Sequence, residues 1–343
     1  MSESAATEVS LEPHRGFALL AALRAWIFLA VLCVGFEAWS HASYHASFLL
    51  NPFNLQSIAV FTVAPLLLAL GQTFVVISGG IDLSVGFTMG FVAVVFSQCL
   101  NQFGPGMGPL ASLGLALLIA LAAGVVPGFI NGWLVARLRV PPFIGTLGMY
   151  GVARGVAYLL ARGTTVPISN PIVNVIGNGT LFGFPVVVLI TVVLVLLMQF
   201  VLTQSRFGQH VYAIGGNRQA SLRAGISVDR NTAALYVLSA LCAAVGGILY
   251  TARFSAGAAQ AGEPLLLDSI AAVVIGGASL FGGSGTIVGT VIGALIIAII
   301  QYGLVFVNVE PFWQFVAVGV VIIISVLVDQ SQRRLSGGRT DEG

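Results

Sequence analysis

Apolar runs long enough to cross a membrane recur along this chain and constrain its fold more than any other feature. A bilayer's hydrocarbon core is roughly 30 Å thick, which a helix of about 20 apolar residues spans. Backbone polar groups in lipid must be satisfied within the protein, so continuous apolar runs form helices there. Hydrophobic residues make up 57% of the sequence and charged residues 8%, which excludes an ordinary soluble domain.

The sequence therefore predicts an all-α polytopic membrane protein. We expect about ten transmembrane helices, at residues 17–39, 55–78, 86–102, 110–136, 142–161, 182–203, 232–252, 266–282, 285–306 and 312–329.

Positive charge is distributed unevenly between the two sides that these spans define. All 14 basic residues are arginine, and short cytoplasmic loops concentrate such residues. A cytoplasmic N-terminus places most of them on that side, namely Arg15, Arg137, Arg139, Arg206, Arg218, Arg223, Arg230, Arg333, Arg334 and Arg339. We therefore expect cytoplasmic tails at 1–16 and 330–343 around a transmembrane domain at 17–329. The net charge of +2 reflects this topology and gives no reason to expect nucleic-acid binding.

One apolar run is interrupted by two glycines and an acid. Residues 78–86 read Ser-Gly-Gly-Ile-Asp-Leu-Ser-Val-Gly between two apolar stretches. Non-helical backbone at membrane depth must be covered by protein or line a water-filled cavity, and an acid there is a functional-site candidate. Asp82 can equally act locally, by capping the helix that follows. The segment therefore predicts a transport role, a structural role or both.

A similar pattern recurs in the second half of the chain. Residues 276–283 share Gly-Gly-x-x-Leu-x-x-Gly with residues 79–86, and Val-Val-Ile precedes both. Paired glycine-interrupted segments in a transporter point to its pathway, which makes Gly276 and Gly277 candidates alongside Gly79 and Gly80. In the predicted topology both segments face the same side, which favours parallel copies of an internal repeat. A chance match among 42 glycines is the alternative.

The longest predicted cytoplasmic loop, 204–231, contains a short helix. Asn217 can cap a helix that begins at Arg218, and Gly225 can end it. Such a helix can enter a groove on a partner protein, or its arginines can hold it on anionic lipid. The chain has no lysine and hence no conventional P-loop, so an ATP-driven transporter built on it needs a separate motor subunit.

Both segments resemble signatures of one family. Residues 79–86 closely resemble the Gly-Gly-Ile-Asp-Leu-Ser-x-Gly signature of the membrane subunits of bacterial ABC importers for monosaccharides, the ribose-type permease family. The loop resembles that family's coupling helix, with Ser221 where alanine is more usual. The coupling residues that the resemblance implies are Gly215, Gly216, Asn217, Arg218, Ala220, Ser221, Ala224, Gly225 and Ile226.

The resemblance covers the chain from about residue 55 to residue 329. It implies a permease subunit of the bacterial inner membrane, with both termini in the cytoplasm and with neither catalysis nor a cofactor of its own. The partners that it implies are an ABC ATPase subunit, a periplasmic or surface substrate-binding protein, a second permease copy and membrane lipid.

Polar side chains inside the apolar spans are the candidates for contact with a sugar, which needs hydrogen-bonding groups and often an aromatic face. The polar candidates are Gln72, Thr73, Ser78, Asp82, Ser84, Asn131 and Gln301, and the aromatic ones are Phe74, Trp133, Phe143 and Tyr150. Each can equally make an interhelical hydrogen bond or packing contact. Glu263 and Asp268, beside an outer glycine-rich turn, are candidates for contact with a binding protein.

Two alternative functions remain compatible with these residues. One is an ion-coupled secondary transporter with Asp82 as its proton or cation site, and the other is an ABC permease for nucleosides. An ion-coupled carrier needs no docking helix, so the loop at 204–231 separates the first alternative from an ABC importer. No metal site is expected, because His41 and His45 share a helix face without a third ligand.

Overall fold

The computed structural model describes residues 15–310 and 312–337, so most of the two predicted tails lies outside it. Its elements, in chain order, are α1 (Arg15–Tyr44), α2 (Pro52–Ile77), α3 (Val85–Ala136), α4 (Pro142–Ala161), β1 (Val166–Pro167), α5 (Pro171–Asn178), β2 (Thr180–Leu181), β3 (Phe184–Pro185), α6 (Val186–Gln204), α7 (Arg206–Gly216), α8 (Arg218–Arg223), α9 (Val228–Phe254), β4 (Ala256–Gly257), α10 (Leu265–Ile275), α11 (Ile287–Phe306) and α12 (Trp313–Gly337). The predicted all-α polytopic class is confirmed.

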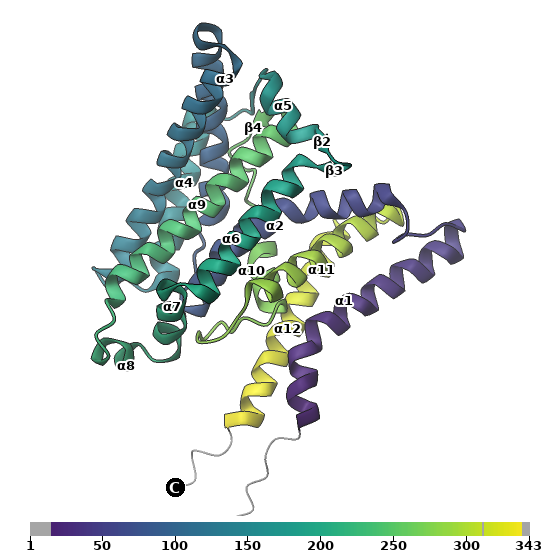
Figure 1. Ribbon diagram of the computed structural model, residues 1–343, viewed down its shortest axis with the longest axis vertical. Coiled ribbons are helices and arrows are strands. Elements are labelled where there is room, and N and C mark those ends of the chain that lie inside the picture. The colour runs from purple at the N-terminus through teal and green to yellow at the C-terminus, as the bar shows by residue number, and fades with distance from the viewer. Residues whose placement is uncertain (1–14, 311, 338–343) are drawn as a thin grey trace, which may run out of the picture.

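Helix α2 lies at the centre of the fold. Of its apolar window, 83% is buried, against 22% for the peripheral α6. Figure 1 shows α3, α4 and α9 packed together on one side of the molecule and α1, α11 and α12 on the other. The largest hydrophobic core, which includes Phe74, Leu235 and Ile296, draws side chains from α2, α9 and α11. Helix α2 therefore joins the two groups.

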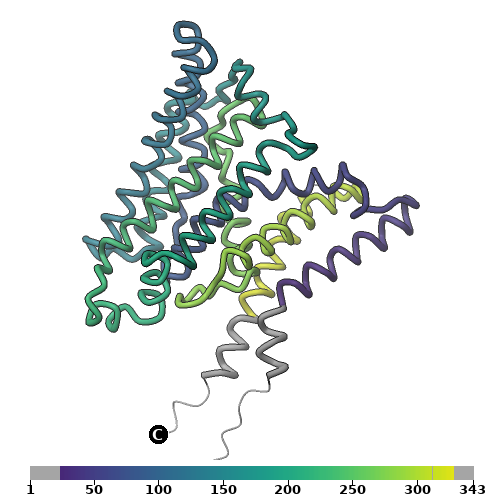
Figure 2. The backbone as a smooth tube through the Cα atoms, viewed as in Figure 1, coloured from purple at the N-terminus to yellow at the C-terminus, as the bar shows by residue number. Residues whose placement is uncertain are grey.

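Helix α3 contains two arms that fold back on each other. The backbone leaves helical geometry at Gly108, where φ is 76°, and Figure 2 shows the chain reversing there. Leu100 on the first arm and Leu113 on the second belong to one hydrophobic cluster. A Cβ at Gly124 would lie 3.2 Å from the side chain of Val92, so the arms remain close along their length. The predicted spans 86–102 and 110–136 correspond to these two arms.

The predicted count of about ten spans is not confirmed. Seven helices of the described ranges are long and apolar enough to cross a membrane when α3 is counted once. The largest difference lies at residues 266–282, where α10 ends after 11 residues, at Ile275. At 1.5 Å per residue such a helix is about 16 Å long, roughly half of the hydrocarbon core. Apolar composition alone does not reveal that Gly276 and Gly277 stop this helix.

The segment between α9 and α10 re-enters the protein instead of crossing to a new span. Gly257 packs against Ala93 of α3, and Gly262 packs against Gly86, nearer the start of the same helix. A Cβ at Gly86 would lie 2.6 Å from the carbonyl oxygen of Gly262, so the two backbones touch. The segment is also held by β4, which pairs antiparallel with β1 through Val166 and Gly257. Non-helical backbone here is covered by protein, as membrane depth requires.

Candidate functional site

Helices α2 and α10 end with the same backbone arrangement. After α2, Gly79 has φ 82° and donates its N–H to Val76, while Gly80 donates to Val75. After α10, Gly277 has φ 95° and donates its N–H to Val274, and Ala278 donates its N–H to Val273. This is the glycine-terminated helix ending in which two N–H groups satisfy the last carbonyls. The sequence echo is therefore a repeated helix stop, with Gly79 equivalent to Gly277 and not to Gly276.

The segment that follows α10 meets the end of α2. Gly283 donates its N–H to the carbonyl oxygen of Ile77, 2.8 Å away. Gly282, with φ 89°, lies so close that a Cβ on it would be 3.0 Å from the backbone nitrogen of Gly79. The prediction that both segments face the same side is confirmed, and close packing accounts for their glycines. Whether Gly276 and Gly277 contact cargo stays a prediction.

Asp82 is fully buried at the centre of a hydrogen-bond network. Its Oδ1 accepts from the backbone N–H of Ser84 at 3.0 Å and from the Ser84 hydroxyl at 2.7 Å. Its Oδ2 accepts from the hydroxyl of Ser239 on α9 at 2.9 Å. Asn131, on the second arm of α3, donates to the Ser84 hydroxyl at 2.8 Å, and Gln72 donates its amide to the Asp82 carbonyl. The network ties the break to α2, α3 and α9.

This network favours the structural role of Asp82. Four donors lie within hydrogen-bond distance of its carboxylate, namely the N–H and hydroxyl of Ser84, the Asn131 amide at 3.5 Å and the Ser239 hydroxyl. Ser84 and not Asp82 is the N-cap of α3, so the carboxylate fixes the residue that begins the helix and does not cap the helix itself. Gln72, Ser84 and Asn131 are also buried. Among the aromatic candidates, Phe74 stacks on Phe207 of α7. These groups make the interhelical contacts that are the alternative to cargo contact.

Helix α7 was not predicted from the sequence. It contacts both glycine breaks, which are the segments 78–84 after α2 and 276–286 after α10. A side chain at Gly215 would overlap the carbonyl oxygen of Ile77, so α7 directly abuts the end of α2. The Tyr212 hydroxyl donates to the carbonyl oxygen of Gly285 at 2.7 Å, which joins α7 to the segment before α11. The sequence signal for α7 was Ser205, whose hydroxyl caps the helix by accepting from the Gly208 N–H at 3.1 Å.

Helix α8 forms where it was predicted and exposes one face. The Asn217 side chain accepts from the Ala220 N–H at 2.9 Å, and Gly225 has φ 80°. The residues that this segment exposes are Gln219, Ala220, Leu222, Arg223, Ala224 and Gly225. Ser221 is buried and its hydroxyl donates to the Asn217 carbonyl. The serine at this position, where alanine is more usual, therefore leaves the exposed face of α8 unchanged.

An acid at the start of α9 anchors α8. Asp229 lies 2.8 Å from Arg139 in the connection between α3 and α4, and 3.5 Å from Arg218 of α8. Figure 1 places α7 and α8 at the end of the molecule opposite the α3 turn. Arg139 and Arg218, both predicted to be cytoplasmic, therefore lie close together at one structural end of the protein, and the side of the membrane that this end faces stays a prediction.

A cavity of about 610 Å³ lies toward the other end of α9. Its walls come from α2, α6, the last turns of α9, the re-entrant segment and the start of α10, with Gln301 of α11. Gln301 is a predicted cargo contact, and Glu263 was predicted to meet a binding protein; both line this cavity. Tyr250 and Phe254 were not singled out from the sequence, because aromatic residues near a helix end also occur at membrane interfaces.

Among the predicted aromatic residues, Tyr150 contacts a residue of the cavity wall. Its hydroxyl donates to the Glu263 carboxylate at 3.4 Å. Phe143 and Trp133 expose 54% and 49% of their surface and do not line it. Asp268 is buried behind the wall and accepts from the Gln301 amide at 2.8 Å.

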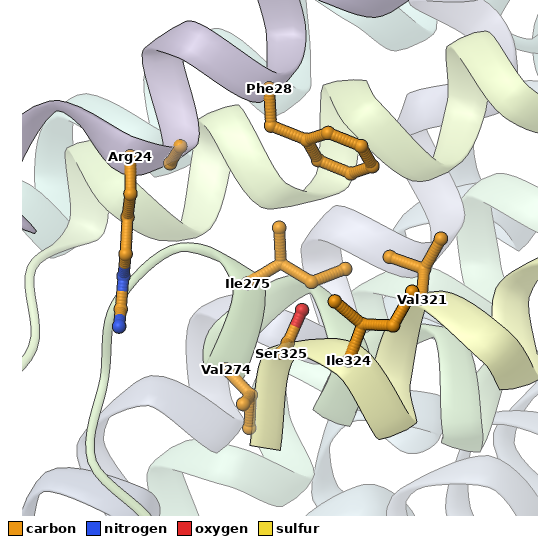
Figure 3. Close-up of a pocket in the computed structure, with 8 residues that line it drawn as sticks. Arg24, Phe28, Val274, Ile275, Val321, Ile324 and Ser325 are labelled. Atoms are coloured by element: carbon orange, nitrogen blue, oxygen red, sulfur yellow. The ribbon is translucent and has the colours of Figure 1, made fainter. Parts of the chain in front are cut away.

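A smaller cavity of about 200 Å³ lies between α1, α10 and α12. Figure 3 shows its walls, where Phe28, Ile275 and Ile324 face one another with Arg24 and Ser325 nearby. Because most of its lining is apolar, it offers few hydrogen-bonding groups to a polar solute.

Comparison with known proteins gives a consistent result. The family model described as "Branched-chain amino acid transport system / permease component" matches residues 54–326. The fructose import permease of Rhizobium meliloti is 36% identical, over 82% of this chain and 78% of its own length. The ribose import permease of Bacillus subtilis is 37% identical over 82% and 86%, and the xylose permease of Haemophilus influenzae is 31% identical over 90% and 96%. No solved structure matches the chain significantly.

Proposed function

Because this chain belongs to the branched-chain amino acid transport system permease family, as residues 54–326 show, we propose that it is the membrane-spanning subunit of an ATP-driven monosaccharide importer. Members of this family are permease components of ABC importers, which hydrolyse ATP on a separate subunit. The chain is accordingly a multi-pass membrane protein and not an enzyme. An ATPase subunit and a substrate-binding protein are the partners of such a permease.

The cargo class rests on one observation. The relatives named for fructose, ribose and xylose import align with this chain over at least 82% of its length. The family match at residues 54–326 includes both glycine breaks, the α7–α8 segment and the 610 Å³ cavity. A fold shared over these regions supports a shared cargo class. The network around Asp82 supports no ion-coupled mechanism, because four internal donors already surround the carboxylate.

Segment α7–α8 is the part through which the ATPase acts in this proposal. The exposed face of α8 is the docking surface, and α7 connects it to both helix breaks through Gly215 and Tyr212. A displacement of α8 would therefore move the endings of α2 and α10 together. Asp229 holds the docking surface in register by binding Arg139 and Arg218.

A second copy of the chain completes the pathway in this proposal. Gly151 and Gly155 lie four apart on α4 with open space beside them, a spacing that allows close helix association. Arg154 on the same exposed stretch lies 5.4 Å from the centre of the Phe87 ring. A charge at this position suits a protein or aqueous environment better than lipid. The membrane is the bacterial inner membrane, and α7, α8 and both termini face the cytoplasm.

Composition of the purified complex tests the proposal. Native mass spectrometry after purification in mild detergent should show two copies of this chain with two ATPase chains. The same complex in vesicles, supplied with the binding protein and ATP, should import at least one of ribose, xylose, fructose and galactose. Transport by the lone chain with an ion gradient alone would contradict the ATP-driven assignment.

The docking surface is tested by Ala220→Arg. A large charged side chain on the exposed face of α8 should abolish uptake and ATPase association while membrane insertion stays normal, because Ala220 is exposed. Thr165→Arg, at an exposed position at the opposite end, is the matched control for ATPase association, which it should leave unchanged. Undiminished uptake in Ala220→Arg would show that α8 does not dock.

A further inference from the structure

We infer that the 610 Å³ cavity between α2, α9 and α11 is a monosaccharide-binding site of the permease itself, in which the sugar pauses on its way inward. This inference rests on the proposed function and adds to it the place of contact and the residues that make it. Four observations carry it.

The cavity has the size and position of a receiving site. Small-molecule sites generally occupy about 300–1,000 Å³, and this cavity lies within that range. Tyr250 lies 22 positions after Val228, the start of α9, which at 1.5 Å per residue is about 33 Å along the helix. The cavity is thus far from α8 and near the end that a binding protein would approach.

Two of its polar groups, Glu263 and Gln301, are held in fixed positions by neighbours outside the cavity. The Glu263 carboxylate accepts from Tyr150, and the Gln301 amide nitrogen donates to the buried carboxylate of Asp268. Each side chain therefore brings further hydrogen-bonding capacity to the cavity without having to be ordered by a ligand. A carboxylate accepts from sugar hydroxyls, and a glutamine carbonyl does the same.

Aromatic rings form another part of the wall. The rings of Tyr250 and Phe254 lie 4.6 Å apart between centroids on consecutive turns of α9, and both line the cavity with Phe61. Apolar ring faces beside hydrogen-bonding groups match the two kinds of surface of a pyranose or furanose. A charge at membrane depth is energetically costly, and an acyl chain in the cavity would not stabilise the Glu263 carboxylate.

Helix α2 adds a backbone acceptor. Pro65 lies inside α2 and has no N–H, so the carbonyl oxygen of Phe61 four residues earlier lacks its helical donor. Both residues line the cavity. A sugar hydroxyl can supply the missing donor, whereas an acyl chain cannot.

The site is tested by chemical protection in membrane vesicles that hold the permease with its ATPase subunits. Gln260→Cys places a thiol in the wall, in a background of Cys33→Ala and Cys99→Ala; Cys242 is buried and is retained. The probes are D-ribose, D-xylose, D-fructose and D-galactose. One of them, at about ten times its Kd, should slow maleimide labelling about tenfold. Thr165→Cys, exposed outside the cavity, should label equally fast with and without sugar.

Two further variants identify the groups that bind. Glu263→Met and Gln301→Leu keep side-chain size and remove the hydrogen-bonding groups, and each should raise the sugar concentration needed for protection about fivefold to tenfold, the usual effect of one lost hydrogen bond. Tyr250→Phe should keep most of the protection, because the ring remains, while Tyr250→Ala should lose it.

The outcomes separate this inference from the proposed function. Vesicles that import a sugar with ATP and binding protein, yet show no protection of Gln260→Cys by that sugar, overturn the cavity assignment and leave the importer intact. A labelling rate that responds to removal of lipid and not to sugar shows that the cavity holds an acyl chain, which also overturns it. Vesicles that import none of the four sugars and show no protection contradict both.

Discussion

The polar groups around Asp82 and those around Glu263 show two uses of polarity within one membrane protein. Asp82 is fully buried, and four donors from Ser84, α3 and α9 surround its carboxylate. Glu263 is partly exposed in a cavity wall, and Tyr150 is the side-chain donor to it among the residues that the structure describes. The first group closes an interruption of the helical backbone, and the second leaves hydrogen-bonding capacity for another molecule. Burial alone therefore does not identify the residues that meet cargo.

The structural role of Asp82 would be contradicted most clearly if Asp82 could be replaced with little loss of stability. Asp82→Ala leaves the Ser84 N–H and the Ser239 hydroxyl buried without their acceptor, at about 1–3 kcal/mol for each orphaned donor. We expect a total loss of roughly 3 kcal/mol or more in unfolding free energy and poor accumulation in the membrane. Thermal unfolding followed by size-exclusion chromatography measures this. Asp82→Asn keeps an acceptor and should lose less; equal losses would mean that the charge matters more than these hydrogen bonds.

The connection between the docking end and the breaks is tested at two adjacent glycines. In Gly215→Ala the added methyl group would overlap the carbonyl oxygen of Ile77, whereas nothing lies within 4 Å of a Cβ at Gly216. Overpacking of this kind costs about 1–3 kcal/mol, and we expect uptake to fall at least about tenfold. Gly216→Ala should stay near the normal rate. Similar uptake rates for the two variants would show that α7 does not press on the end of α2.

A smaller effect is expected at the cavity. Tyr150→Phe removes the hydroxyl that holds Glu263 and keeps the ring that packs edge-on against Phe87 at 4.7 Å. Stability should change by less than about 1 kcal/mol, the net worth of one hydrogen bond, while the uptake rate falls severalfold. If the stability loss were as large as that of Asp82→Ala, the hydrogen bond to Glu263 would be structural, as those of Asp82 are. The proposed contrast between a structural Asp82 and a cargo-binding Glu263 would then be contradicted.

The smallest effect is expected at the surface of the docking end. Arg139 is 54% exposed and Asp229 is 36% exposed, and exposed ion pairs contribute about 0–1 kcal/mol. Arg139→Ala should therefore leave thermal stability within that range and weaken ATPase association modestly, with an effect that shrinks at high salt. Binding of the ATPase subunit at two ionic strengths is the measurement. A salt-independent loss would indicate that Arg139 packs instead of pairing.

Apolar periodicity and length sufficed to predict the class of fold, because lipid permits few backbone solutions. The glycine stop at 276–277 and the reversal at Gly108 depend on φ values of 95° and 76°, which composition does not encode. For the same reason α10 was expected to extend across the membrane. Helix boundaries could be predicted where a cap residue marked them, as Asn217 does for α8.

The candidate site was predictable in part. Asp82 was correctly placed at a local break in the helical backbone, since an acid beside two glycines rarely continues a lipid-facing helix. Gln301 was singled out for its polarity, and the structure places it in the cavity wall. Tyr250 and Phe254 could not be singled out, because their role depends on the re-entrant segment folding back beside them. Contacts between segments distant in sequence, such as Gly215 with Ile77, leave no pattern in either segment alone.

The short length of α10 also bears on how the protein is made. A nascent segment of 11 residues is too short to be recognised as a membrane span, and its flanking non-helical backbone is intolerable in bare lipid. Synthesis delivers α2 before α10, and α2 supplies part of the surface that packs against it, whereas α11 and α12 supply much of the rest and follow it in the chain. We therefore expect α10 to enter the membrane after α2 is in place and together with the later helices α11 and α12, so the length of one helix bears on the order of insertion.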